Sequence, residues 1–172
     1  AALVSKVVFS VSLTPSSTAY WFSGFKNLEA VSQIENLHTS LVTDMRNMFQ
    51  NCSFITELDV SGFQTGNVAN MEGMFDGCLS LASLDVSGFD TSNVANMRRM
   101  FANCRALSYL DLSAFDTSSV RYMDSMFKNC VGLKRIYVSE KFSVALVLGS
   151  DSEDMFGDCV TLVGGNGTVY DG

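Results

Sequence analysis

The residues best suited to chemistry in this sequence are five cysteines, nine methionines and one histidine. All five cysteines end the same string, Met-Phe-x-x-Cys: Cys52, Cys78, Cys104, Cys130 and Cys159. Thiols that bind a metal lie a few residues apart in sequence, whereas neighbours here are 26 residues apart and the last pair 29. The spacing therefore favours buried structural thiols over a disulfide or a metal site.

The methionines and the histidine give no second site. Eight methionines form pairs at two repeated positions, where thioethers serve far more often as adaptable core filler than as soft-metal ligands. His38 has no second histidine with which to hold a metal, and it occupies a loop position. We therefore predict no catalytic residue, no metal and no cofactor, so the chain is not expected to be an enzyme.

Three carboxylates also recur every 26 residues, at Asp59, Asp85 and Asp111. On stacked strands they would lie about 4.8 Å apart per step, where like charges repel. Three interpretations remain open: the carboxylates are hydrogen-bonded to the backbone or solvated, they form an acidic stripe that binds a partner, or they hold calcium. The first is favoured because a single column supplies few of the six to eight oxygens that calcium requires.

Composition excludes several classes of protein. The chain has 172 residues, 47% of them hydrophobic and 17% charged, which is typical of a folded domain and not of a disordered one. A net charge of −7 does not fit binding to nucleic acid or to an anionic membrane surface. No apolar run is long enough to span a bilayer, and no signal peptide begins the chain.

The elements that position these residues can be read from one 26-residue unit. Its first half carries apolar residues three and four positions apart, the spacing of one helix face: Val94, Met97, Met100, Phe101, Cys104 and Leu107. The period then changes to two, which directs Leu110 and Leu112 to one side and Tyr109 and Asp111 to the other. Each unit is therefore predicted to be a short helix, a turn and a short strand.

Such units cannot bury their apolar faces alone, so they must stack. We predict an α/β fold, a leucine-rich-repeat-like solenoid with parallel strands on one face and short helices on the other. The strands are expected near residues 57–60, 83–86, 109–112 and 135–138, and the helices should end near the five cysteines. Residues 1–172 form one repeat domain, with a strand and degenerate capping repeat at 1–47, regular repeats at 48–138 and an irregular last repeat at 139–172.

The unit resembles a known family. From Phe89 the chain reads Phe-Asp-Thr-Ser-Asn-Val-x-x-Met-x-x-Met-Phe-x-x-Cys-x-x-Leu-x-x-Leu-Asp-x-Ser, which is similar to the repeat of BspA-like leucine-rich surface proteins, shared with surface lipoproteins of mycoplasmas. The resemblance covers about residues 7–170. It implies a bacterial leucine-rich-repeat solenoid on the cell surface, used for adhesion or partner binding, and brings no catalytic residue with it. The chain departs from ordinary leucine-rich repeats by carrying Phe63, Phe89 and Phe115 where those have asparagine.

The outward strand positions give the candidate binding residues. They run from acidic, at Asp59, Asp85 and Asp111, to aromatic and basic, at Tyr109, Arg135 and Tyr137. Tyrosine and arginine are frequent anchors of protein interfaces. We therefore expect a fragment of a larger exported protein that binds a protein partner, either a host matrix protein or another surface protein. The alternative is a structural spacer that projects another domain from the cell surface.

Overall fold

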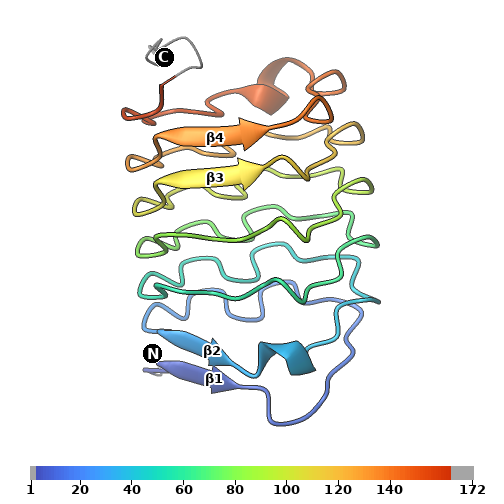
Figure 1. Ribbon diagram of the computed structural model, residues 1–172, viewed down its shortest axis with the longest axis vertical. Coiled ribbons are helices and arrows are strands. Elements are labelled where there is room, and N and C mark those ends of the chain that lie inside the picture. The colour runs from blue at the N-terminus through green and yellow to red at the C-terminus, as the bar shows by residue number, and fades with distance from the viewer. Residues whose placement is uncertain (1–2, 164–172) are drawn as a thin grey trace.

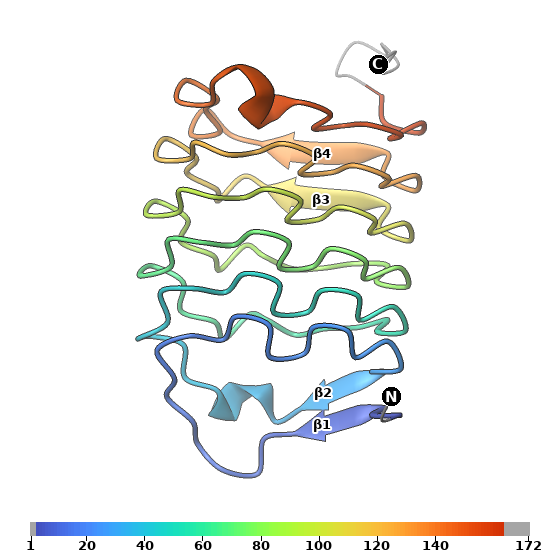
Figure 2. The same cartoon turned by 180° about the vertical axis from the view of Figure 1, so that it is seen from behind.

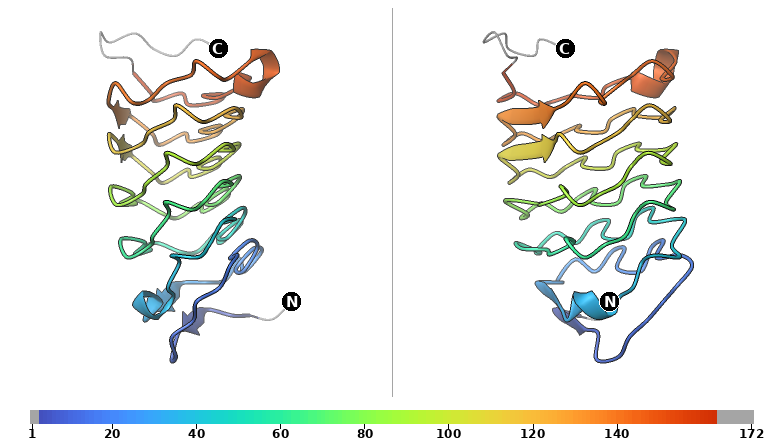
Figure 3. Two further views of the ribbon diagram at one scale, coloured as in Figure 1. Left: turned by 90° about the vertical axis from the view of Figure 1, so that its right-hand side faces the viewer. Right: turned by 45° about the vertical axis from the view of Figure 1, so that its right-hand side comes forward.

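The computed structural model describes residues 3–163. The chain winds in successive units that stack on one another along the longest axis of the molecule (Figure 1). Seen from behind, each unit continues into a second run of chain that crosses the opposite face (Figure 2). The side views show these two faces as the two walls of a narrow stack (Figure 3). We call them the strand face and the turn face.

Pairing on the strand face is parallel, as predicted, but it is limited to the two ends of the stack. Near the amino end β1 (Lys6–Val8) pairs with β2 (Ala30–Ser32), and near the carboxyl end β3 (Tyr109–Leu112) pairs with β4 (Arg135–Val138). The strands predicted at 57–60 and 83–86 are wrong, because these segments run across the same face without forming a strand.

The predicted α-helices are also wrong, since residues 3–163 contain no α-helix. Two short 3₁₀ helices are present, η1 (Ile34–Asn36) and η2 (Gly149–Ser152), and the second leads into the last turn segment. The turn face consists instead of residues 18–26, 44–52, 70–78, 96–104, 122–130 and 151–159. Within it, Met48 N–H donates to Met45 C=O over 3.2 Å, while Met45 N–H donates to Asn70 C=O of the next unit over 2.9 Å. Alternate amides thus close a local turn or join neighbouring units, and the isolated parallel bridges Asp44–Asn70, Asn70–Asn96 and Asn96–Tyr122 lie on the same segments.

Positive backbone φ angles explain why turns replace helices. Asn47 and Asn51, the third residues of the turns 45–48 and 49–52, have φ of 53° and 59°. An α-helix requires negative φ throughout, whereas a type II turn requires positive φ at its third position. The same two positions have positive φ in the later units, at Gly73 and Gly77, Arg99 and Asn103, Ser125 and Asn129, and Asp154 and Asp158.

The core is built from columns of identical side chains. All eight paired methionines and all five cysteines are fully buried, so both structural interpretations of these residues are confirmed. Beside them runs a stack of phenylalanine rings whose neighbouring centroids lie 5.1–6.0 Å apart: Phe22, Phe49, Phe75, Phe101, Phe127 and Phe156. Aromatic pairs at these spacings add to the free energy of simple burial.

Polar side chains join the units inside the stack. Each cysteine thiol donates to the carbonyl of a phenylalanine in the preceding unit, as Cys104 Sγ does to Phe75 over 3.3 Å. The free thiols are buried, and burial raises their pKa values, to about 12 for Cys52 and Cys130. Buried threonines form a second ladder, in which Thr91 Oγ1 donates to Asp116 C=O and accepts from Asp116 N–H, both over 2.9 Å. These bonds satisfy the buried thiols and the hydroxyls of Thr39, Thr65, Thr91 and Thr117.

Candidate functional site

The candidate site lies on the strand face in the carboxyl half of the stack. The parallel register of β3 and β4 places Tyr109 beside Arg135 and Asp111 beside Tyr137. Alternation along β3 buries Leu110 completely, so the neighbouring side chains project outward. Tyr109 is 53% exposed and Tyr137 is 47% exposed. The structure thus brings together four of the six residues chosen from sequence, on two hydrogen-bonded strands.

The three column aspartates are tied to the backbone. Asp59, Asp85 and Asp111 each accept a hydrogen bond over 2.9 Å from the backbone N–H of the serine two residues further on. Hydrogen bonds from the side chain and backbone of that serine lower the pKa of each carboxyl below its ordinary value, because they stabilise the charged form. Of the three sequence interpretations, hydrogen bonding to the backbone is confirmed. The carboxylates are exposed and remain charged at neutral pH.

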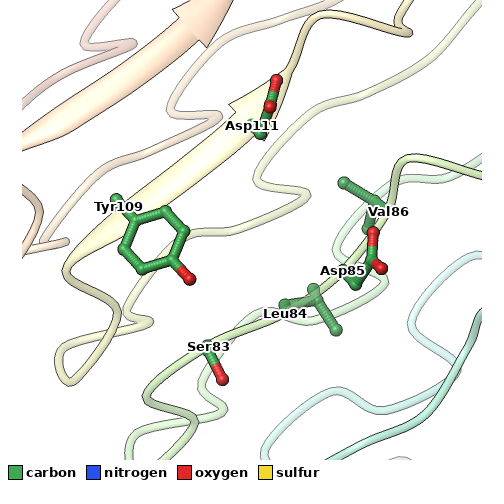
Figure 4. Close-up of a pocket in the computed structure, with 6 residues that line it drawn as sticks. All are labelled: Ser83, Leu84, Asp85, Val86, Tyr109 and Asp111. Atoms are coloured by element: carbon green, nitrogen blue, oxygen red, sulfur yellow. The ribbon is translucent and has the colours of Figure 1, made fainter.

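A hollow of about 250 Å³ separates two of these aspartates (Figure 4). It lies between segment 83–86 and β3, and its lining residues are Ser83, Leu84, Asp85, Val86, Tyr109 and Asp111. In Figure 4 the ring of Tyr109 extends from β3 toward segment 83–86, with Asp85 and Asp111 further along the two segments. Asp59 and the β4 residues Arg135 and Tyr137 do not line it. Sequence reasoning missed this hollow because it treated the strand face as one continuous sheet.

The turn face carries charged groups that pair with one another across units. Arg98 pairs with Asp124, and its Nη2 lies 3.0 Å from Asp151, so it joins three successive units. Its guanidinium also lies 4.7 Å from the ring centre of Tyr122. Hydrogen bonding to Asp124 raises the pKa of Arg98. These contacts connect units to one another and leave the turn face with fewer free charges.

The described residues offer little material for other chemistry. Within 3–163 no group of three or more His, Cys, Asp or Glu side chains could hold a metal ion. His38 is exposed in a loop, as its sequence position indicated. No helix in this part of the chain is long and apolar enough to cross a membrane. The exposed side chains of Tyr109 and Tyr137 project from the hydrogen-bonded strands β3 and β4.

Comparison with known proteins gives one family and two related structures. A family model described as "Mycoplasma protein of unknown function, DUF285" matches residues 16–141. No curated protein matches the chain. The leucine-rich repeat protein TpLRR of T. pallidum is 18% identical, with 77% of this chain and 69% of that chain covered and a TM-score of 0.47. A leucine-rich repeat protein of Eubacterium ventriosum is 19% identical over 95% of this chain and 47% of that chain, with a TM-score of 0.46.

Proposed function

We propose that this chain, which belongs to the family described as Mycoplasma proteins of unknown function (DUF285), is a non-catalytic repeat domain that binds a protein partner. One observation carries the proposal. Tyr109, Asp111, Arg135 and Tyr137 project from two strands in fixed register, with half of each tyrosine exposed to solvent. Tyrosine and arginine are the residues that most often anchor protein interfaces.

The position of these residues supports the same role energetically. An anchor contributes most when binding does not have to order it first, because immobilising a side chain or a loop costs free energy. β3 and β4 are hydrogen-bonded to each other, and the inward residues Leu110 and Leu112 are fully buried. The backbone beneath the two tyrosines is therefore already fixed before a partner arrives.

The more specific part of the proposal, which concerns the family and the location of the domain, rests on the resemblance of the repeat sequence. We place the domain in a BspA-like leucine-rich-repeat solenoid on the outside of a bacterial cell, where its partner is a host matrix protein or another surface protein. A spacer that only projects a further domain is the competing proposal. Catalysis is disfavoured because the repeats arrange identical groups in lines, whereas catalysis needs different groups that converge on one point.

The test is a triple variant, Tyr109→Ser, Arg135→Ser and Tyr137→Ser, assayed against an array of purified host matrix proteins. All three side chains are exposed, so the melting temperature should change little. Loss of a centrally placed anchor commonly costs 2 kcal/mol or more, and we therefore expect binding to weaken about thirtyfold or more.

A matched control removes an aromatic residue and an arginine elsewhere, with Phe54→Ser and Arg105→Ser. Both side chains are exposed in connecting segments outside β3 and β4. The control should bind as the parent protein does. Unchanged binding by the folded triple variant would place the interface on another surface, and no binding by the parent protein to any member of the array would favour the spacer.

A further inference from the structure

The strand face is interrupted in the middle of the stack, although the turn face is not. On the turn face, isolated parallel bridges join Asn70 to Asn96 and Asn96 to Tyr122. On the strand face, segment 83–86 lies one 26-residue repeat before β3, yet within the described chain β3 pairs with β4 and not with this segment. Figure 1 shows the chain wider apart here than between β3 and β4. The hollow of about 250 Å³ lies at this interruption.

Backbone groups at the hollow lack the partners that a continuous sheet would supply. The N–H groups of Ser83, Leu84 and Asp85 donate no hydrogen bond to any residue between 3 and 163. On the other side, Ser108 C=O accepts from Lys134 N–H beside β4. Because backbone groups alternate sides along an extended chain, those of Tyr109 and Asp111 face away from β4 and toward the hollow. By the same alternation Leu84, which is equivalent to Leu110 one repeat earlier, faces the hollow from the other side, whereas Ser83 and Asp85 face away from it. Unpaired strand edges of this kind are templates for an added strand.

The negative charge of the side chains that line the hollow favours one kind of ligand. Asp85 and Asp111 line the hollow, and hydrogen bonds from Ser87 and Ser113 lower their pKa values, so both are ionised at neutral pH. A cationic occupant is therefore favoured. The volume lies below the 300–1,000 Å³ common for small-molecule pockets, and the lining consists of two parallel runs of backbone. A narrow strip of extended chain fits this shape better than a compact ligand.

We propose that the hollow between segment 83–86 and β3 binds one extended peptide segment of a protein partner, with lysine or arginine at alternate positions. The peptide backbone bonds to the backbone groups of Leu84 on one side and to those of Tyr109 and Asp111 on the other. Its basic side chains, which project on one face with a period of two, lie against Asp85 and Asp111. The proposal rests on the proposed function, since it names the chemistry of the partner at the same surface.

The two segments must part further when the peptide enters. Neighbouring strands lie about 4.8 Å apart, so a strand placed between two others needs about 9.5 Å between them. The hydrogen bonds of the turn face hold these two units together on the opposite side, as Met71 N–H to Asn96 C=O does over 2.9 Å. Opening on the strand face therefore requires no break between the units on the turn face.

The test uses the whole chain and a synthetic seven-residue peptide of alternating lysine and valine, with an acetylated amino end and an amidated carboxyl end. A second peptide has the same sequence with its valine amides methylated, which removes the hydrogen-bond donors and keeps the charge. A third replaces lysine by glutamate. We expect the first peptide to bind, and the methylated and acidic peptides to bind at least tenfold more weakly.

Protein variants locate the binding. Asp85→Asn and Asp111→Asn keep the oxygen that accepts from the serine amide and remove the charge, so each should weaken the first peptide roughly two- to fivefold, as expected for exposed ion pairs. Asp90→Asn is the matched control: it makes the same bond with Ser92, lies outside the hollow and should change nothing. Hydrogen exchange should slow at the amides of Leu84, Tyr109 and Asp111 when the peptide is bound.

Several results would overturn the proposal. Equal binding of the methylated and unmethylated peptides would exclude strand addition, and equal effects of Asp90→Asn and Asp85→Asn would exclude the hollow. Slower exchange at these same three amides with rising protein concentration alone would assign the hollow to a second copy of the chain. If no peptide binds while the Tyr109, Arg135 and Tyr137 triple variant loses its matrix partner, the inserted strand is wrong and the proposed function stands.

Discussion

Because some positions of the turn face have positive φ, replacing serine by glycine should raise the free energy of unfolding at those positions and lower it at positions with negative φ. Ser125 has φ of 56°, and its N–H donates to Glu153 C=O over 2.9 Å. A residue with a β-carbon costs about 1–2 kcal/mol in this left-handed region, whereas glycine adopts it freely. Against this, glycine lowers stability by about 0.5–1 kcal/mol through the greater freedom of the unfolded chain. We therefore expect Ser125→Gly to stabilise the fold by about 0.5–1 kcal/mol.

Two further changes complete the experiment. Ser80 lies in a turn with negative φ and is partly exposed like Ser125, so Ser80→Gly should destabilise by about 0.5–1 kcal/mol. Gly77 has φ of 79°, and a β-carbon there would lie 2.5 Å from Asn51 Oδ1, so Gly77→Ala should cost about 1–2 kcal/mol. Calorimetry resolves these effects, since 1 kcal/mol corresponds to about 2–4 °C in a chain of this size. Equal losses of melting temperature for Ser125→Gly and Ser80→Gly would show that the turn assignment is wrong.

The remaining predictions concern the core and one surface charge. Thr18 is fully buried, and its hydroxyl has no hydrogen-bond partner among the described residues, so Thr18→Val should raise the free energy of unfolding in urea by about 1 kcal/mol. Thiol reagents should find no fast-reacting cysteine in folded protein and close to five in denatured protein, because burial raises the pKa of Cys52 and Cys130 to about 12. For the same reason the stability that the buried, protonated thiols contribute should be fully present below about pH 8.5, where the thiols of the unfolded chain also keep their protons. Above this pH the free energy of unfolding should fall by up to about 1.4 kcal/mol per pH unit for each thiol. A free energy of unfolding that does not change between about pH 8 and 10 would contradict this burial. Met100→Asp should unfold the stack by placing a carboxylate in a fully buried site, while Arg98→Asp should lower stability by about 1 kcal/mol through lost surface ion pairs, as circular dichroism melts would show.

The repeat and its core could be predicted from the sequence because burial depends only on the direction of side chains. Met97, Met100 and Cys104 point inward in the structure, as their spacing indicated. The same spacing nevertheless predicted the wrong backbone. Residues three and four apart share a face both in an α-helix and in a run of turns that closes every third or fourth residue. Apolar periodicity cannot separate these two conformations.

The signal that separates them was present in other residues. The third position of each turn holds Asn47 and Asn51 in one unit and Gly73 and Gly77 in the next. Asparagine and glycine adopt positive φ more readily than other residues, and they lower the stability of a helix interior. Their recurrence four residues apart in successive units indicates turns. Arg99, which has positive φ without this preference, shows that the unit imposes the conformation even where the residue does not favour it.

The candidate site was predictable only in part. Alternation along β3 and β4 correctly placed Tyr109, Asp111 and Tyr137 outward. The hollow was not predictable, because it depends on the distance between neighbouring units and not on the type of any one residue. Leu84 and Leu110 occupy equivalent positions and both point inward, yet only Leu110 lies in a hydrogen-bonded strand. Sequence periodicity describes a unit, whereas the fit between units depends on the packing of the whole stack.

Comparison of units within the chain separates residues that the fold requires from those it does not. Inward positions repeat the same residue because each must fill the same space between its neighbours, as the methionine, cysteine and phenylalanine columns do. The outward position that holds Glu57 in one unit holds Ser83, Tyr109 and Arg135 in the next three, and all four side chains are exposed. Packing therefore does not dictate Tyr109 or Arg135. Proteins built from the same stack can differ in what they bind only through residues that packing leaves free to vary. Tyr109 and Arg135 are two such residues, and they lie side by side on β3 and β4 next to the interruption in the sheet.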